Sequence, residues 1–426
     1  MTSRHVKRVK ILPGILGLVS AFSLHFLINV TGTGYCFEIN HETAILDRFT
    51  IENNGFDSTN KTFERDEIRN RLFISPLISC SFSDSVEAIL SGDAEWTRST
   101  KSPTDTIDFT LRNAYLGWSQ NGLSLKAGLQ TFYIAKGLIL YDDEPGLSAE
   151  FKQGSTVLDA KAAIIEDSSP LIELGVAYQP VFFEHVRLFG TWFSDRDNGF
   201  AEAVHNALHP TPFSSRGDLY WYGLDIGWFL KKAYLSGIFV KQNGASTLKW
   251  KHREKRVHLS AYLLDIGLEY GFSDALSGEL FVFVASGDKH PRRGRFKSFI
   301  AINPYNSRSA IFFNGGIDEP FSTDKLSLSG ITMAGVIAPG VKMTFEPENR
   351  FSAELGFTAL FPAKRPGGKR DFYGWEADSI FTFHATSNMD CMIEIDYFHL
   401  GSFFERRRHH NPSAVLNLIV GFDIFF

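Results

Sequence analysis

The end of the chain shows a regular alternation of apolar and polar positions. From Leu416 to Phe426 every even-numbered residue is apolar. The intervening face carries Asn417, Gly421 and Asp423. Such period-two alternation predicts a β-strand with one apolar face. A final strand that ends on an aromatic residue is typical of a transmembrane barrel, which has an apolar outer band and aromatic rims. An edge strand of a soluble sandwich is the alternative.

Alternating segments of about ten to fifteen residues recur along the rest of the chain, and the links between them alternate in length. Short links are predicted at 83–84, 120–121, 153–154, 180–184, 231, 272–274, 347–349 and 387–388. Long links are predicted at about 53–65, 99–105, 135–146, 195–216, 244–256, 288–329, 363–371 and 402–411, with the shorter link 167–169 in the same series. Outer-membrane barrels place short turns in the periplasm and long loops outside. Counting back from Phe426 at the periplasmic rim predicts one all-β antiparallel barrel of about eighteen strands, the first between Cys36 and Ile51.

The N-terminus has the layout of a secretory signal peptide. A basic start that includes Arg4 and Lys10 precedes an apolar stretch at 11–30, and small residues follow up to Gly34. We therefore expect a cleaved signal peptide at 1–34 and the barrel at 35–426. The apolar stretch is long enough for an uncleaved anchor as the alternative. Tyr35 precedes Cys36 where lipidation requires a small residue, so we do not expect a lipoprotein.

Composition supports the barrel and excludes other classes. Forty Phe and thirty-six Gly suit aromatic girdles and tight turns. A hydrophobic content of 44% without a second long apolar run excludes a helical membrane protein. Three scattered cysteines are too few for a disulfide framework or a zinc site. The net charge of −5 argues against a nucleic-acid partner.

Alternation also assigns the side chains that face the lumen. The predicted pore-lining residues are Arg69, Arg71, Arg112, Lys126, Gln130, Arg187, Glu354, Glu376, Asp378, Glu394 and Asp396. Cations dominate the early strands and carboxylates the later ones. We expect a basic wall that faces an acidic wall, an arrangement that selects charged solutes. The alternative is that these charges pair with one another and only fill the lumen.

Several segments resemble the alginate-export family of Gram-negative outer-membrane porins. The segments are 111–118 (LRNAYLGW), 123–130 (LSLKAGLQ), 374–378 (GWEAD) and 399–404 (HLGSFF). Lys126 and Leu129 depart from the family's Gly-Arg-Gln strand, and Leu400 replaces a proline. The resemblance implies an eighteen-stranded barrel whose basic lumen conducts an anionic polysaccharide, lined by Arg112, Lys126, Glu376 and Asp378. The acidic second half departs from a purely cationic conduit.

We therefore predict an outer-membrane porin for charged solutes, with an anionic saccharide as a candidate. A plugged structural or adhesive barrel is the main alternative, because the segment 288–329 is rich in apolar residues for an exposed loop and could fold inward. A hydrolase is less favoured, because His384 and His399 lack an accompanying nucleophile motif. The adjacent His409 and His410 lack the carboxylates of a metal site, so no metal or cofactor is expected.

Two further partners are expected in the membrane. Basic clusters occur in four predicted extracellular loops, and lipopolysaccharide carries the phosphates that such clusters attract. These clusters are Lys249, Lys251, Arg253, Lys255 and Arg256; Arg292, Arg293, Arg295 and Lys297; Lys364, Arg365, Lys369 and Arg370; and Arg406, Arg407 and Arg408. The last strand, which ends at Phe426, resembles the signal read by the barrel-assembly machinery of Gram-negative bacteria.

Overall fold

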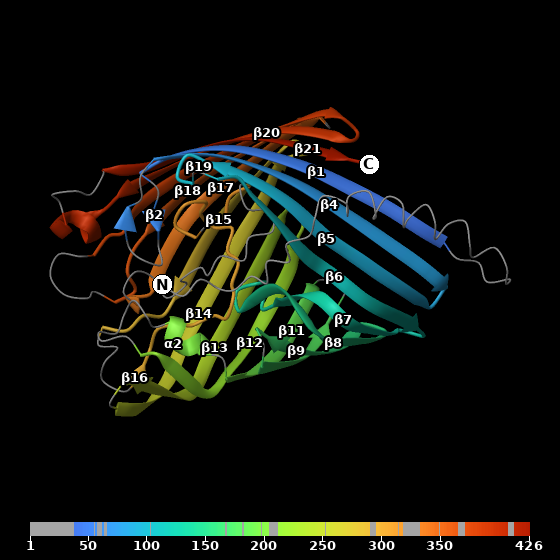
Figure 1. Cartoon of the computed structure of the whole chain (residues 1–426), viewed down its shortest axis with the longest axis horizontal. Helices are drawn as coiled ribbons and strands as arrows, with labels where there is room; N and C mark the ends of the chain where they lie inside the picture. The colour runs from blue at the N-terminus through green and yellow to red at the C-terminus, as the bar shows by residue number, and fades with distance from the viewer. Residues whose placement is uncertain are drawn as a thin grey trace.

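The chain folds into a closed antiparallel β-barrel (Figure 1). The computed structural model describes residues 38–54, 56–57, 62–63, 66–102, 104–166, 168–180, 183–196, 198–203, 212–251, 253–289, 295–313, 315–317, 333–348, 350–364, 371–407 and 413–426. The predicted signal peptide and most of the link 53–65 lie outside these residues. Among the described residues, no helix has the length and apolarity needed to cross a bilayer.

The barrel wall has eighteen strands, as the sequence predicted. The main sheet contains nineteen strands, but the two-residue β16 (Arg295–Phe296) only pairs with the outer end of β14 and is not part of the wall. The wall strands are β1 (Glu38–Asn53), β4 (Glu67–Ser83), β5 (Val86–Ser99), β6 (Thr106–Gln120), β7 (Leu123–Ile134), β8 (Leu140–Gln153), β9 (Thr156–Ile165), β10 (Ser169–Tyr178), β11 (Phe183–Asp195), β12 (Ser214–Leu230), β13 (Ala233–Trp250), β14 (Arg253–Ser273), β15 (Leu276–Ala285), β17 (Val336–Glu348), β18 (Phe351–Leu360), β19 (Gly374–Thr386), β20 (Met389–Leu400) and β21 (Ala414–Phe425). Short elements in the links are β2 (Phe56–Asp57), β3 (Thr62–Phe63), α2 (Gly199–Ala203) and the 3₁₀-helix η3 (Ser402–Arg407).

The barrel closes where the two ends of the chain meet. β1 pairs with β21 on one side and with β4 on the other. At this seam the Phe426 N–H donates to the Thr43 carbonyl at 2.9 Å, and the Thr43 N–H donates to the Phe426 carbonyl at 3.1 Å. Closure leaves no open edge in the wall, which is the condition for a sheet to span a bilayer.

Alternation sorts the side chains as the sequence predicted. On β10, Leu171 and Glu173 are buried inside the barrel, whereas Ile172 and Leu174 are exposed on its outer face. Apolar side chains of this kind are exposed around most of the outer wall. An apolar outer face and a polar inner face are the pattern of a membrane barrel, in which lipid covers the outside.

The predicted short links at 83–84, 120–121, 153–154, 231, 272–274 and 387–388 are tight turns between neighbouring strands, and the links at 180–184 and 347–349 lie partly outside the described residues. Asn121 and Gly122 join β6 to β7 with φ angles of 52° and 81°, the left-handed conformation that two-residue hairpin turns require. Two long links were predicted wrongly. Residues 140–146 of the predicted link 135–146 belong to β8. Residues 244–256 are mostly strand, because β13 continues to Trp250 and β14 begins at Arg253. Lys249, Glu254 and Arg256 in this stretch lie on the outer face, beyond the apolar band.

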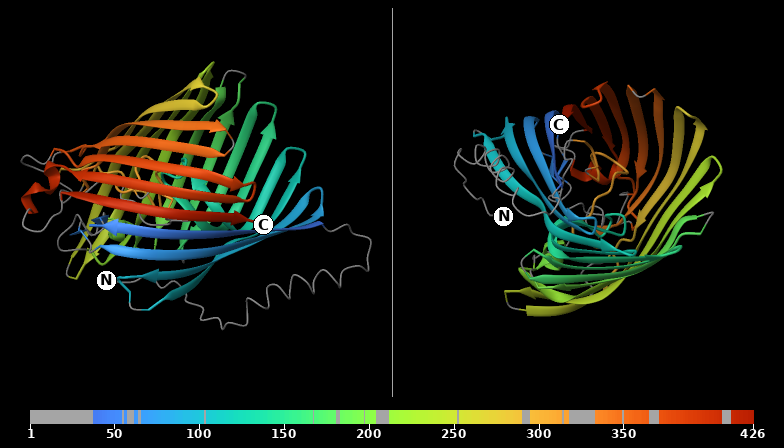
Figure 2. Two further views of the ribbon diagram at one scale, coloured as in Figure 1. Left: turned by 90° about the horizontal axis from the view of Figure 1, so that it is seen from above. Right: turned by 90° about the vertical axis from the view of Figure 1, so that its right-hand side faces the viewer.

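The hairpin of β7 and β8 bends into the lumen. Pairing of β7 with β6 ends at Leu129, but pairing with β8 continues to Ile134. The tip of this hairpin, residues 135–139, is therefore detached from the wall strand β6. The apolar residues Ala135, Leu138 and Ile139 of the tip are buried. Figure 2 shows this hairpin inside the ring of strands.

A second segment, residues 297–317 between β15 and β17, also folds inward; we call it the inner segment (Figure 2). Near its start, the Ile300 carbonyl accepts hydrogen bonds from Trp221 Nε1 (3.1 Å) and Gln242 Nε2 (2.9 Å) on the wall. Further along, Phe313 packs edge-on against Phe283 of β15. The apolar residues that made this link unusual for an exposed loop thus form a core between the inner segment and the wall. This outcome agrees with the inward fold that the plug alternative required.

Candidate functional site

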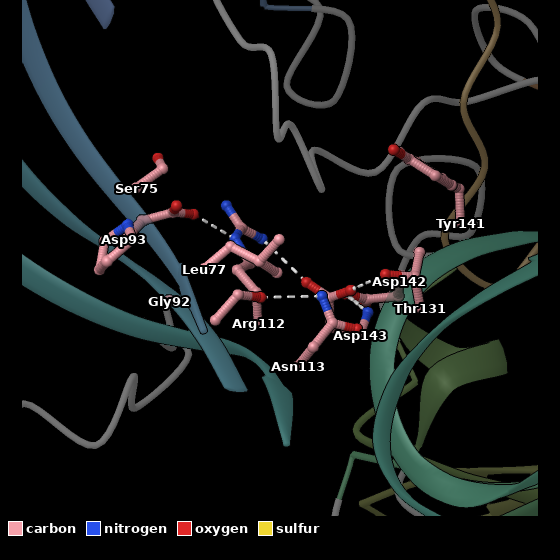
Figure 3. Close-up of a pocket in the computed structure, with 12 residues that line it drawn as sticks. Ser75, Leu77, Gly92, Asp93, Arg112, Asn113, Thr131, Tyr141, Asp142 and Asp143 are labelled. Carbon is pink, nitrogen blue, oxygen red and sulfur yellow. Dashed lines mark hydrogen bonds and ion pairs between the residues drawn. The ribbon is translucent and has the colours of Figure 1, made fainter. Parts of the chain in front are cut away.

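A cavity of about 250 Å³ remains between the inward hairpin and the neighbouring wall strands (Figure 3). The wall contributes residues of β4, β5 and β6, and the hairpin contributes residues of β7 and β8. The lining residues are Ser75, Pro76, Leu77, Ser91, Gly92, Asp93, Arg112, Asn113, Thr131, Tyr141, Asp142 and Asp143. We call this region the constriction, because both inward elements narrow the lumen here.

Arg112 occupies the centre of the constriction because of an irregularity in β6. Leu111 pairs with Gly92 and Asn113 pairs with Ser91, so Arg112 is an extra residue that forms a β-bulge. Bulges redirect a side chain relative to the regular alternation. Here the guanidinium group is directed between two carboxylates, those of Asp93 and Asp143.

The contacts of Arg112 tie the wall to the hairpin. Its Nε donates to Asp93 Oδ2 on the neighbouring strand, and its Nη1 lies 3.3 Å from Asp143 Oδ2 on β8. The other oxygen of Asp143 accepts a hydrogen bond from Thr131 Oγ1 at 2.6 Å. Charge-assisted hydrogen bonds of this kind are the stronger class in proteins, so they fix the position of the hairpin relative to the wall.

The hairpin is also bound to the inner segment. The Tyr141 N–H donates to the Asn303 carbonyl at 2.7 Å, and Asn303 Nδ2 donates to Asp142 Oδ2 at 2.7 Å. The Tyr305 N–H donates to the Gly137 carbonyl at 2.9 Å. The two inward elements therefore form one hydrogen-bonded unit across the lumen.

The constriction carries more negative than positive charge. Its lining includes one guanidinium group, that of Arg112, and the three carboxylates of Asp93, Asp142 and Asp143. In a confined passage such a set attracts a cationic group and repels an anionic one. Among the described residues, no group of three or more His, Cys, Asp or Glu side chains is arranged to hold a metal ion.

Arg69 and Arg71 are predicted pore residues that face inward, but they do not face the acidic strands across the lumen. The order of strands at the seam is β20, β21, β1, β4, so Arg71 on β4 lies three strands from Glu394 on β20. The predicted opposition of basic and acidic walls is wrong for these arginines, because closure makes the first and last strands neighbours. Arg71 lies 4.0 Å from Glu95 and 5.4 Å from the ring centre of Phe73.

Lys126, Gln130 and Arg187 also face inward, and each contacts other wall residues. Lys126 Nζ lies 3.4 Å from the Tyr115 hydroxyl and 4.9 Å above its ring. Gln130 accepts a hydrogen bond from Ser148 Oγ at 2.7 Å and donates to the Gly146 carbonyl at 3.2 Å, which holds the base of the hairpin.

Arg187 forms a compact network of charges with its neighbours on the wall. Its Nη2 lies 2.6 Å from Asp159 and 2.7 Å from Glu173, which also binds Lys161 at 3.0 Å. The geometry of Arg187 therefore agrees with the alternative that the inward charges pair with one another and fill the lumen.

Two of the five predicted acidic residues, Glu376 and Glu394, hold the inner segment. Buried Glu376 accepts hydrogen bonds from the Ile311 N–H (2.6 Å), the Phe312 N–H (3.0 Å) and Ser309 Oγ (2.8 Å). Glu394 accepts one from the Ile317 N–H at 2.8 Å.

The other three predicted carboxylates lie on the same part of the wall. Asp378 pairs in register with Asp396, and the two lie beside Glu376 and Glu394. Glu354 on β18 binds Lys342.

The sequence analysis missed the charges carried by the inner segment and the seam. Arg308 lies 3.2 Å from Asp265 and 2.7 Å from Glu279 on the wall. Burial lowers the pKa of Arg308, but the carboxylates of Asp265 and Glu279 outweigh this and raise its pKa above the ordinary value. Arg48 on β1 is buried and binds Asp423. No sequence pattern could reveal Arg308, because its partners are distant in the chain.

The fold and the constriction define the class: a large membrane barrel narrowed by two inward elements.

No family model matches the chain, including any for the expected alginate-export family, and no curated protein matches it. Solved structures do match. OprD from Pseudomonas aeruginosa is 9% identical with a TM-score of 0.56, covering 93% of this chain and 95% of that one. OccK5 (OpdH) from the same organism is 10% identical with a TM-score of 0.55, covering 91% and 98%. OpdK with vanillate is 11% identical with a TM-score of 0.51, covering 91% and 99%. At these identities the likeness shows a shared fold.

Proposed function

We propose that the protein is an outer-membrane channel of a Gram-negative bacterium that passes small polar solutes through the constriction. The observation that carries the proposal is the cavity between the wall and the inward hairpin, with Arg112 held between Asp93 and Asp143. A barrel with lipid on the outside and a polar passage inside has the parts that selective permeation needs. OprD, which shares the fold, is an outer membrane protein of Pseudomonas aeruginosa, which supports the outer-membrane location.

The size of the passage favours small solutes over polymers. Two hydrogen-bonded inward elements lie inside the barrel, and the cavity between the hairpin and the neighbouring wall strands has a volume of about 250 Å³. A structure of OpdK was solved with vanillate, a small molecule, which supports a solute of that scale. The anionic polysaccharide implied by the alginate-export resemblance fits less well, because a long chain would have to displace the hairpin.

The charge of the passage favours cationic or zwitterionic solutes. Asp142 and Asp143 lie on the hairpin side, and Arg112 and Asp93 lie on the wall side. A solute with an ammonium group and a carboxylate could pair with both sides at once, because each of its charges has an opposite partner in the lining. Catalysis is not part of the proposal. His384 binds Asp390 at 2.7 Å near the periplasmic rim, without a hydroxyl nucleophile bonded to it among the described residues.

Single-channel recording in a planar bilayer tests the proposal. We expect a conducting pore whose reversal potential in a salt gradient indicates preference for cations. Replacing Asp142 and Asp143 together by Asn should reduce that preference, whereas Glu150→Gln on the same strand, outside the constriction, should leave it nearly unchanged. A purified, folded barrel that conducts no ions would contradict the proposal and favour the plugged structural barrel.

A further inference from the structure

The three long strands β12, β13 and β14 lie side by side in the wall (Figure 1). Their pairing arranges the outward side chains in regular rows across the three strands, which we call the grid. Thr247 on β13 pairs in register with Arg216 on β12 and with Arg256 on β14. Both arginines are exposed and alternate with residues buried inside the barrel, so they point away from the lumen. Neighbouring strands are about 4.8 Å apart, which separates the two arginine backbones by roughly 10 Å.

Toward the membrane centre the side chains of the grid become aromatic and then apolar. Lys241 on β13 pairs with Tyr222 on one side and Tyr262 on the other. The row below consists of Leu224, Phe239 and Leu264, and the apolar band begins there. Tyrosines at this boundary mark the interface between lipid tails and head groups. Lys241 therefore lies at head-group level, and the arginine row lies about 20 Å farther along the strands on the extracellular side.

These outward cations are not neutralised by the grid's own carboxylates. Asp218 accepts a hydrogen bond from Trp192 Nε1 at 3.3 Å, and Glu254 binds Lys249 at 3.0 Å. No ion pair joins Arg216, Lys241 or Arg256 to a carboxylate within the described residues; the Lys241 amine donates to Ser260 Oγ at 3.1 Å.

Other strands offer no comparable surface at this level of the wall. The outer face of β6 shows Ile107 and Phe109, and that of β10 shows Ile172. An outward arginine on β5, Arg98, lies 4.0 Å from Asp105. The cationic grid is thus confined to one arc of the described wall.

We propose that this grid binds the phosphates of one lipopolysaccharide molecule in the outer leaflet. The Lys241 row would bind a lipid A phosphate, with acyl chains against Leu224 and Phe239, and the Arg216 and Arg256 row would bind phosphates of the inner core sugars. Arginine binds phosphate oxygens in bidentate fashion, which suits the upper row. Lipopolysaccharide is favoured over a phospholipid because the cations lie at two depths, whereas a phospholipid carries its phosphate at a single depth. The proposal depends on the outer-membrane location and not on which solute the channel passes.

The test measures lipopolysaccharide bound to the full-length barrel in detergent, by native mass spectrometry and by titration with purified lipopolysaccharide. The variant R216A/K241A/R256A should bind on the order of a hundredfold more weakly, since each of the three basic residues near a lipid surface contributes about 1 kcal/mol. The matched control R98A removes an outward arginine elsewhere and should bind like the wild type. The variant R216K/R256K should retain much of the affinity, because it keeps the charge and loses only the bidentate geometry.

Two outcomes would overturn the proposal. One is equal lipopolysaccharide affinity in the triple variant and the wild type. The other is equal wild-type affinity for lipopolysaccharide and for phosphatidylglycerol vesicles, with both lost in the triple variant, which would indicate a general anionic-lipid surface. Single-channel conductance of each variant confirms that the barrel is folded, and loss of lipid binding with normal conductance separates this site from the channel function.

Discussion

Arg112 on β6 and Asp143 on β8 form an ion pair of 3.3 Å that joins the barrel wall to the inward hairpin. Neither residue neighbours the other in the regular ladder, because β7 lies between their strands. The bulge at Arg112 and the inward bend of the hairpin bring them together. The pair therefore acts both on the charge of the passage and on the position of the element that narrows it.

Arg112→Gln should make the channel more cation-selective and raise its conductance. The change removes the one guanidinium group in the constriction and frees the hairpin from the wall, while Asp93 and Asp143 remain. Reversal potentials and unitary conductance in planar bilayers measure both effects. Lys152→Gln, on β8 beyond the constriction, is the control. An unchanged reversal potential in Arg112→Gln would show that Arg112 is only structural.

Glu376→Gln should loosen the inner segment. The wild-type carboxylate accepts hydrogen bonds from Ile311, Phe312 and Ser309 on its two oxygens, and an amide has only one oxygen, so at least one of these donors loses its acceptor. An unsatisfied buried group costs about 1–3 kcal/mol. We expect noisier open-channel current and faster proteolysis within 297–317.

Glu354→Gln is the comparison for that experiment, because Glu354 binds Lys342 on the wall and not the inner segment. Equal noise and equal proteolysis in both variants would argue against a specific role of Glu376. A lower conductance in Glu376→Gln would show that the released segment blocks the passage.

Deleting Phe426 should lower the yield of assembled barrel in the outer membrane. The deletion removes the two backbone hydrogen bonds with Thr43 that end the β1–β21 seam, together with the terminal aromatic. Heat-modifiable migration on gels, compared with total synthesis, measures assembly. Phe426→Tyr keeps the backbone bonds and the aromatic ring and should assemble normally. Wild-type assembly of the deletion would refute the role assigned to the seam.

Surface labelling should confirm the orientation of the barrel. Tags within 363–371 and 402–411 should be labelled on intact cells, because these links follow β18 and β20 at the end opposite Phe426. A tag at 347–349, between β17 and β18, should be labelled only after the outer membrane is opened. The reverse pattern would invert the assignment of inside and outside.

Much of the barrel could be predicted from the chain alone because the pattern that encodes it is local. Two-residue alternation decides the face of each side chain, and turn residues such as Asn121 and Gly122 end strands wherever they occur. Every strand of the wall presents apolar side chains to lipid, so the alternation repeats around the wall. Strand number, most of the short turns and the inward direction of residues such as Lys126 and Arg187 follow from it.

The constriction depended on contacts between residues far apart in the sequence. Arg308 meets Asp265 and Glu279, and Glu376 meets Ile311, only after the inner segment has folded into the lumen. The seam between β1 and β21 placed the early arginines beside the late carboxylates, and linear order could not show this. Alternation determined which charges faced inward. Only the tertiary structure decided which of them pair, because pairing depends on closure of the barrel and on the path of the two inward elements.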